Sequence, residues 1–121
     1  MGEKKRRIAA AKAGANGAAQ QAIAQAISLL RSGRRDEARA IFVPLLDTPI
    51  SDADALDHLG ILAIELDRPE RAVKLLQRAI ALDAGVVSYH NTLAIAFRRL
   101  GRFDDAIGAL GRAIDLRPDL H

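Results

Sequence analysis

The chain of 121 residues contains no cysteine, and this absence excludes several kinds of chemistry at once. Without a thiol there is no disulfide framework, no thiolate metal site and no cysteine nucleophile. Aromatic residues are also scarce, at 3% of the chain, with no tryptophan. Hydrophobic residues nevertheless make up 50% of it, most of them small or aliphatic, which is enough for one buried core. This composition favours closely packed helices over β-sheets.

Other absences concern membranes and catalysis. No stretch reaches the roughly 18 apolar residues that cross a bilayer, and Lys12 and Asn16 interrupt the opening segment where a signal peptide needs an apolar core. The histidines, His58, His90 and His121, are not spaced as a metal pair on one helix. No glycine-rich phosphate loop or nucleophile-elbow serine is present. We therefore predict a cytoplasmic protein that is not an enzyme and uses no metal or cofactor.

The net charge of +3 is concentrated at the start of the chain. Residues 1–12 hold five basic residues and one acidic residue, so the remainder is close to neutral. We predict that residues 1–18 form a basic, alanine- and glycine-rich tail that is flexible or partly helical. Two interpretations of this tail remain open: a solvated terminus, or a segment that touches nucleic acid or anionic lipid. Specific nucleic-acid recognition is not expected, because aromatic residues for base stacking are lacking.

A repeat of 34 residues determines the expected architecture. Ala38, Ala72 and Ala106 follow one another at this step, and other columns keep the same register without an insertion. These columns are Ala26, Gly60 and Ala94; Phe42, Leu76 and Leu110; Leu46, Ile80 and Ile114; and Gly33, Asp67 and Gly101. Such a register indicates stacked units, each of which buries its apolar face against its neighbour.

Each unit is predicted to contain two helices. In the third unit, apolar residues recur at helical spacing over residues 93–100 and again over residues 106–116. Gly101 is placed to end the first helix, and Pro118 marks the end of the second. In the first unit, Pro44 falls inside the second helix, which it should kink or divide.

These features resemble the tetratricopeptide repeat, whose pattern is W-x2-L-G-x2-Y, then A-x3-F, then P. The resemblance covers roughly residues 19–118, with repeats at about 19–52, 53–86 and 87–120. The third unit matches at His90, Leu93, Ala94, Phe97, Ala106, Leu110 and Pro118, the second at Leu56, Leu59, Gly60, Ala63, Ala72, Leu76 and Ala84, and the first, most weakly, at Ala22, Gln25, Ala26, Leu29, Ala38, Phe42 and Ile50. The resemblance implies an all-α fold: a right-handed α-solenoid of three antiparallel helix pairs.

The resemblance also implies a protein–protein interaction module, because the first helices of such repeats line a concave groove that receives a peptide or a helix. By matched columns, the groove residues are Ile23, Ile27, Leu30, Asp57, Ile61, Ile64, Asn91, Ile95, Arg98 and Arg99. The column of Ile27, Ile61 and Ile95 is identical in all three units. It is either plain core or an apolar track for an amphipathic partner helix.

Family members that clamp an acidic C-terminal carboxylate use Lys, Arg and Asn at a set of groove sites. Those sites correspond here to Ile23, Ile27, His58, Ser88 and Thr92. None of the five is Lys, Arg or Asn, so we do not expect binding of that kind.

Two alternative functions remain open. The run from His90 onward looks like repeats that precede glycosyltransferase, sulfotransferase or methyltransferase domains in bacterial proteins, so the chain can be the N-terminal array of a larger enzyme. The weaker alternative is a self-assembling scaffold. Leu76 and Leu110 are expected to be buried between units. The outer face of the last helix has no covering helix in this sequence, so we expect either an end-to-end homodimer or burial of that face against residues outside the given sequence. The self-association face would consist of Ile107, Leu110, Ile114 and Leu116.

Overall fold

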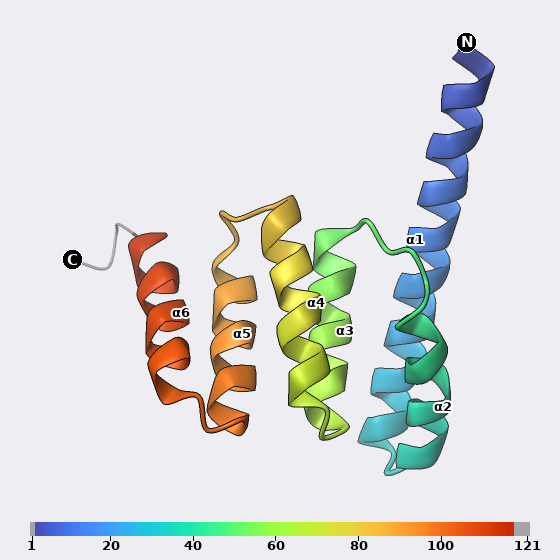
Figure 1. Cartoon of the computed structure of the whole chain (residues 1–121). Coiled ribbons are helices and arrows are strands. Elements are labelled where there is room, and N and C mark those ends of the chain that lie inside the picture. The colour runs from blue at the N-terminus through green and yellow to red at the C-terminus, as the bar shows by residue number, and fades with distance from the viewer. Residues whose placement is uncertain (1, 118–121) are drawn as a thin grey trace.

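The computed structural model describes the backbone of residues 2–117 and the side chains of residues 16–117. Residues 2–117 form six helices and no strand. The helices are α1 (Gly2–Arg31), α2 (Arg35–Leu45), α3 (Ala53–Glu65), α4 (Pro69–Leu82), α5 (Val87–Arg99) and α6 (Phe103–Asp115). Figure 1 shows them as antiparallel pairs in a row, from α1 and α2 at one end to α6 at the other. This arrangement confirms the predicted all-α repeat solenoid.

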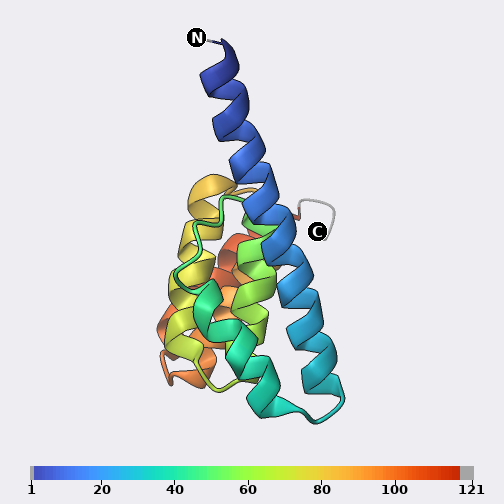
Figure 2. The ribbon, with the colours of Figure 1, turned by 90° about the vertical axis from the view of Figure 1, so that its right-hand side faces the viewer.

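The first helix is the longest, and its N-terminal turns extend beyond the other helices (Figures 1 and 2). The side chains of residues 1–15 lie outside the described residues. The tail boundary at residue 18 and both interpretations of the basic segment therefore stay predictions. Pro118, expected to mark the end of the last helix, also lies outside the described residues.

The same hydrogen bonds end the first helix of every repeat. The N–H groups of Arg34, Arg68 and Arg102 each donate to the carbonyl oxygen five residues earlier, at 2.8 to 2.9 Å. The residue before each arginine has a left-handed conformation, as the Schellman motif requires. These residues are Gly33, Asp67 and Gly101, with φ angles of 77°, 60° and 74°. The predicted turn column is thus confirmed in all three repeats.

Asp67 takes the place that glycine holds in the other two turns. Aspartate tolerates this conformation better than most residues with a side chain. Its carboxylate accepts a hydrogen bond from Arg35, at the start of α2, at 3.0 Å. Its other oxygen lies 3.9 Å from Arg99, at the end of α5. Asp67 therefore connects all three repeats, although each exposed ion pair contributes little to stability by itself.

The paired columns of small and large residues form the core. A Cβ atom added at Gly60 would overlap the side chain of Leu76, so the absence of a side chain at Gly60 lets α4 pack closely on α3. Leu76 and its equivalent Phe42 are buried, as expected. Leu110, the third member of the column, is 46% exposed. The expectation that Leu110 is buried is wrong, because no helix in the described part of the chain follows α6 to cover it.

Pro44 shortens the second helix. α2 ends at Leu45, whereas α4 continues to Leu82, whose equivalent in the first repeat is Thr48. A proline has no N–H to donate to the carbonyl oxygen four residues earlier, and its ring crowds that carbonyl. The helix therefore ends one residue after Pro44. The next helix, α3, begins at Ala53. The side chain of the preceding Asp52 caps it by accepting hydrogen bonds from the N–H groups of Asp54 and Ala55.

We predict that Leu76→Ala lowers the free energy of unfolding by about 2–5 kcal/mol, because it leaves a cavity between α3, α4 and α5. The matched control is Leu82→Ala on the same helix. Leu82 is 54% exposed, so its loss should change stability by less than about 0.5 kcal/mol. Urea unfolding followed by circular dichroism measures both. Equal losses from the two variants would contradict the packing described here.

Candidate functional site

Three isoleucines at matched positions form an apolar row on the first helices of the repeats. Ile27 lies on α1, Ile61 on α3 and Ile95 on α5. Ile61 and Ile95 are 37% and 40% exposed, and Ile27 is partly buried against the core. Isoleucine is among the residues most often fully buried, so its exposure at the same position of successive repeats marks a distinct surface. We call these three residues the isoleucine row.

A recess of about 470 Å³ lies between α1 and α3, at the start of the row. Its lining residues are Ile27, Leu30, Arg31, Ile61, Leu62 and Glu65. The lining is mainly aliphatic. The two charged residues, Arg31 and Glu65, are the last residues of α1 and α3, so charge is confined to one end of the recess.

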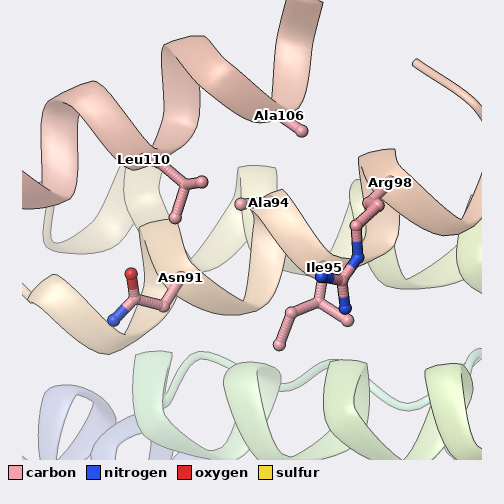
Figure 3. Close-up of a pocket in the computed structure, with 6 residues that line it drawn as sticks. All are labelled: Asn91, Ala94, Ile95, Arg98, Ala106 and Leu110. Carbon is pink, nitrogen blue, oxygen red and sulfur yellow. The ribbon is translucent and has the colours of Figure 1, made fainter. Parts of the chain in front are cut away.

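A second recess, of about 260 Å³, lies between α5 and α6 at the other end of the row. Figure 3 shows Asn91, Ile95 and Arg98 along α5, with Leu110 reaching toward Ala94 from α6. Among residues 16–117, no carboxylate forms an ion pair with Arg98. This recess therefore combines an apolar wall with one cation that is available to a ligand.

Not every residue expected in the groove reaches this surface. Ile23, Asp57 and Ile64 are buried, and their placement in a ligand groove is corrected. The physical reason is the packing of α3 on α1 and of α5 on α3, which covers side chains on that side of each helix. Arg99 is exposed but lies 3.9 Å from the carboxylate of Asp67.

The remaining expected residues, Ile27, Leu30, Ile61, Asn91, Ile95 and Arg98, line the row or its two recesses. Sequence reasoning missed Arg31, Leu62 and Glu65. Little in the sequence indicates these residues, because Arg31 and Glu65 occupy equivalent helix ends but do not form a column of like residues: their charges are opposite.

A part-buried polar contact joins α3 to α5. The Tyr89 hydroxyl donates a hydrogen bond to the Asp54 carboxylate, and the Tyr89 ring is buried. Burial, followed by the hydrogen bond to Asp54, raises the pKa of Tyr89. Burial also raises the pKa of Asp57, whose Oδ1 atom has no hydrogen-bond partner among the described residues. These groups orient α5 on α3 and do not converge on a cavity, so we assign them a structural role.

The face expected to self-associate lies on α6. Ile107, Leu110, Ile114 and Leu116 are 67%, 46%, 58% and 38% exposed. Phe103, at 61% exposed, extends this surface and was missed, because its column contains Arg35 and Pro69 rather than apolar residues.

The described part of the chain contains no group of three or more potential metal-ligating side chains. It also has no helix that is both long and apolar enough to cross a membrane.

The fold and the repeated small–large columns define a helical-repeat protein. Models of the tetratricopeptide repeat match residues 23–87 and 87–120. The chain belongs to the tetratricopeptide repeat family. Rat N-alpha-acetyltransferase 25, the NatB auxiliary subunit, is 32% identical over 81 residues. The match covers 67% of this chain and 8% of that protein, so the chain spans less than a tenth of the relative's length.

Solved structures share the fold at low sequence identity. The first repeat domain of Spaghetti (RPAP3), bound to an HSP90 peptide, superposes with a TM-score of 0.69 at 16% identity, over 86% of this chain and 82% of that one. PcrH, in complex with the chaperone binding region of PopB, gives a TM-score of 0.67 at 22% identity, over 86% and 84% of the two chains. MamA gives 0.68 at 22% identity, over 95% and 66%.

We predict that Asp57→Asn makes the protein more stable at pH 7. The folded-state pKa of Asp57 is raised above the unfolded value of about 3.9. The contribution of this group to stability is therefore fully present below about pH 4 and is lost as the pH rises through the folded-state pKa. An amide avoids the buried charge, so the difference between variant and native protein should grow from pH 4 to pH 7.

Urea unfolding at several pH values measures this difference. Asp47→Asn, at an exposed position, is the control and should behave like the native protein. A loss of stability at pH 7 in the Asp57→Asn protein would mean that the carboxylate is favourably solvated or hydrogen-bonded.

Proposed function

We propose that this protein is an interaction module that binds an amphipathic α-helix of a partner protein along the isoleucine row, with no catalysis of its own. The observation that carries this proposal is the exposure of Ile61 and Ile95, at 37% and 40%. Most matched apolar columns of this chain are buried wherever a following repeat covers them. The isoleucine row remains exposed in the second repeat, which has neighbours on both sides.

The spacing of the row fits a helix. Packed helices lie about 8–10 Å apart, so the three isoleucines follow one another at about that step. Along an α-helix, residues i and i+7 lie on the same face about 10.5 Å apart. A partner helix that crosses α1, α3 and α5 would thus offer one apolar side chain to each isoleucine. Insertion of an apolar helix face into an apolar groove is a recurrent mode of recognition.

The charges at the two ends give the partner a direction. Arg98 lies at one end of the row, and Arg31 and Glu65 lie beside the recess at the other. We infer that the bound helix places an acidic residue near Arg98. Because an exposed ion pair contributes roughly 0–1 kcal/mol, this contact would set orientation more than affinity.

Two related folds support a peptide-binding role. The PcrH structure holds a region of PopB, and the Spaghetti domain holds an HSP90 peptide. This chain differs from family members that clamp an acidic C-terminal carboxylate. At two of the positions that correspond to such a clamp, Ile23 is buried and Ile27 is apolar. An apolar helix is therefore the favoured ligand over an acidic C-terminus.

We predict that Ile61→Lys weakens binding at least about tenfold, or roughly 1.4 kcal/mol, because a lysine in the middle of the row must be desolvated against the apolar face of the ligand. The probe is a helix selected from a phage-displayed library of random peptides against the native protein. Fluorescence anisotropy measures its affinity for each variant. The selected sequences should repeat apolar residues at i, i+3 or i+4, and i+7.

The matched control is Leu82→Lys, since Leu82 is an exposed leucine on α4 outside the row. It should leave the affinity unchanged, and circular dichroism should show that both variants fold. An unfolded Ile61→Lys protein would mean that the row is core. A folded variant with native affinity would mean that ligands use another surface.

A further inference from the structure

The last described helix carries an uncovered apolar stripe. Phe103, Ile107, Leu110 and Ile114 are 61%, 67%, 46% and 58% exposed. Their spacing of four, three and four residues places them on one face of α6, in the pattern of a two-helix seam. We call these four residues the α6 stripe. Contiguous exposed apolar surface of this kind marks an interaction site.

The repeat register shows that such a face is normally covered. Val73 and Leu76, on α4, are the equivalents of Ile107 and Leu110, and both are buried. The helix that follows them, α5, packs against α4. Since no described helix follows α6, the same positions remain in contact with water. The stripe therefore corresponds to a surface that is buried between repeats elsewhere in the described chain.

Head-to-tail stacking, with the α1 end of one copy against the α6 end of the next, does not provide a suitable cover for the α6 stripe. The positions that become buried when a repeat precedes them are Tyr89, Leu93 and Ala96 in α5, and their equivalents Ala55, Leu59 and Leu62 in α3. The equivalents in α1, the first described helix, are Gln21, Gln25 and Ser28. All three are exposed and polar. The α1 end of a second copy would bring these polar groups against apolar side chains.

The α6 stripe is instead complementary to itself. Its spacing reads the same in both directions, so a twofold axis at the centre of α6 places Phe103 opposite the partner's Ile114, and Ile107 opposite the partner's Leu110. An isologous interface requires this property. Gly111 lies beside the stripe, and a Cβ atom added there would meet nothing within 4 Å. The absence of a side chain at that point lets a second backbone approach closely.

We propose that two copies of this chain associate through antiparallel α6 helices to form a closed homodimer. This dimer goes beyond the proposed function, because it uses a surface separate from Ile27 and Ile61. Leu110 belongs both to the stripe and to the recess beside Ile95, so the dimer borders that end of the row. A helix of 13 residues is about 20 Å long. Two such helices form a small interface, and small interfaces are typical of weak, transient association, so we expect the dimer to dissociate in the micromolar range.

Sedimentation equilibrium from about 1 to about 500 µM tests the association, with the dissociation constant expected in the tens of micromolar. Ile107→Glu should weaken it at least tenfold, because the charge would lie against the partner's Leu110. The matched control, Leu82→Glu, alters an apolar residue of similar exposure that is not part of the stripe. It should leave the dissociation constant unchanged, and circular dichroism should show that both variants fold.

The orientation can be tested with introduced thiols, because the native chain has no cysteine. Ile107→Cys and Leu110→Cys proteins are mixed and oxidised. Antiparallel pairing predicts that the mixed disulfide exceeds its statistical share of about half. The proposal is overturned by a monomer at every concentration, which would mean that the stripe binds another protein or stays exposed to solvent. It is also overturned by a dimer that tolerates Ile107→Glu, by species that grow beyond a dimer, or by an excess of the two homodisulfides.

Discussion

The close approach of paired helices at small side chains is the constraint on which this structure depends. A side chain at Gly60 would overlap that of Leu76, and the small residues Ala26 and Ala38, on α1 and α2, are fully buried. α3 is held by α4 within its own repeat, by α1 before it and by α5 after it. Three sides of the helix are thereby occupied. The isoleucine row lies on the side that remains, and its exposure is a consequence of how the helices stack.

The two ends of the stack differ in chemistry, and this difference limits how the protein can assemble. The α1 end presents Gln21, Gln25 and Ser28 where inner repeats present apolar residues. The α6 end presents an apolar stripe with no cover among the described residues. Head-to-tail addition of copies would bring polar side chains of one end against apolar side chains of the other, whereas the proposed dimer pairs the apolar end with itself.

The repeat step, the helices and their turns could be predicted from the sequence, because they follow from spacing and local chemistry. Gly33 and Gly101 have the left-handed conformation that a helix end requires. Pro44, expected to kink or divide its helix, lies one residue before the helix ends. Burial was harder to predict. Ile61 and Ile64 lie three residues apart on α3, yet one is exposed and the other is buried against neighbouring helices. A matched column identifies equivalent positions but not the direction in which each side chain points.

The same column can also differ in burial from one repeat to the next. Leu76 is buried and Leu110 is not, because burial at this position depends on the repeat that follows. A residue can also lie on an apolar surface when its column is not apolar. Phe103, the first residue of α6, is part of the α6 stripe, although its equivalents in the other repeats are Arg35 and Pro69. Contacts made between repeats therefore had to come from the structure.

The proposed separation of two binding surfaces, the isoleucine row and the α6 stripe, is tested most directly by methyl NMR of protein labelled at its isoleucine side chains. Addition of a helix selected against the protein should shift the methyl resonances of Ile27, Ile61 and Ile95. Dilution of the free protein should instead shift those of Ile107 and Ile114. A selected helix that shifts Ile107 and Ile114 while leaving the isoleucine row unchanged would contradict this account, because α6 would then be the surface that binds the partner.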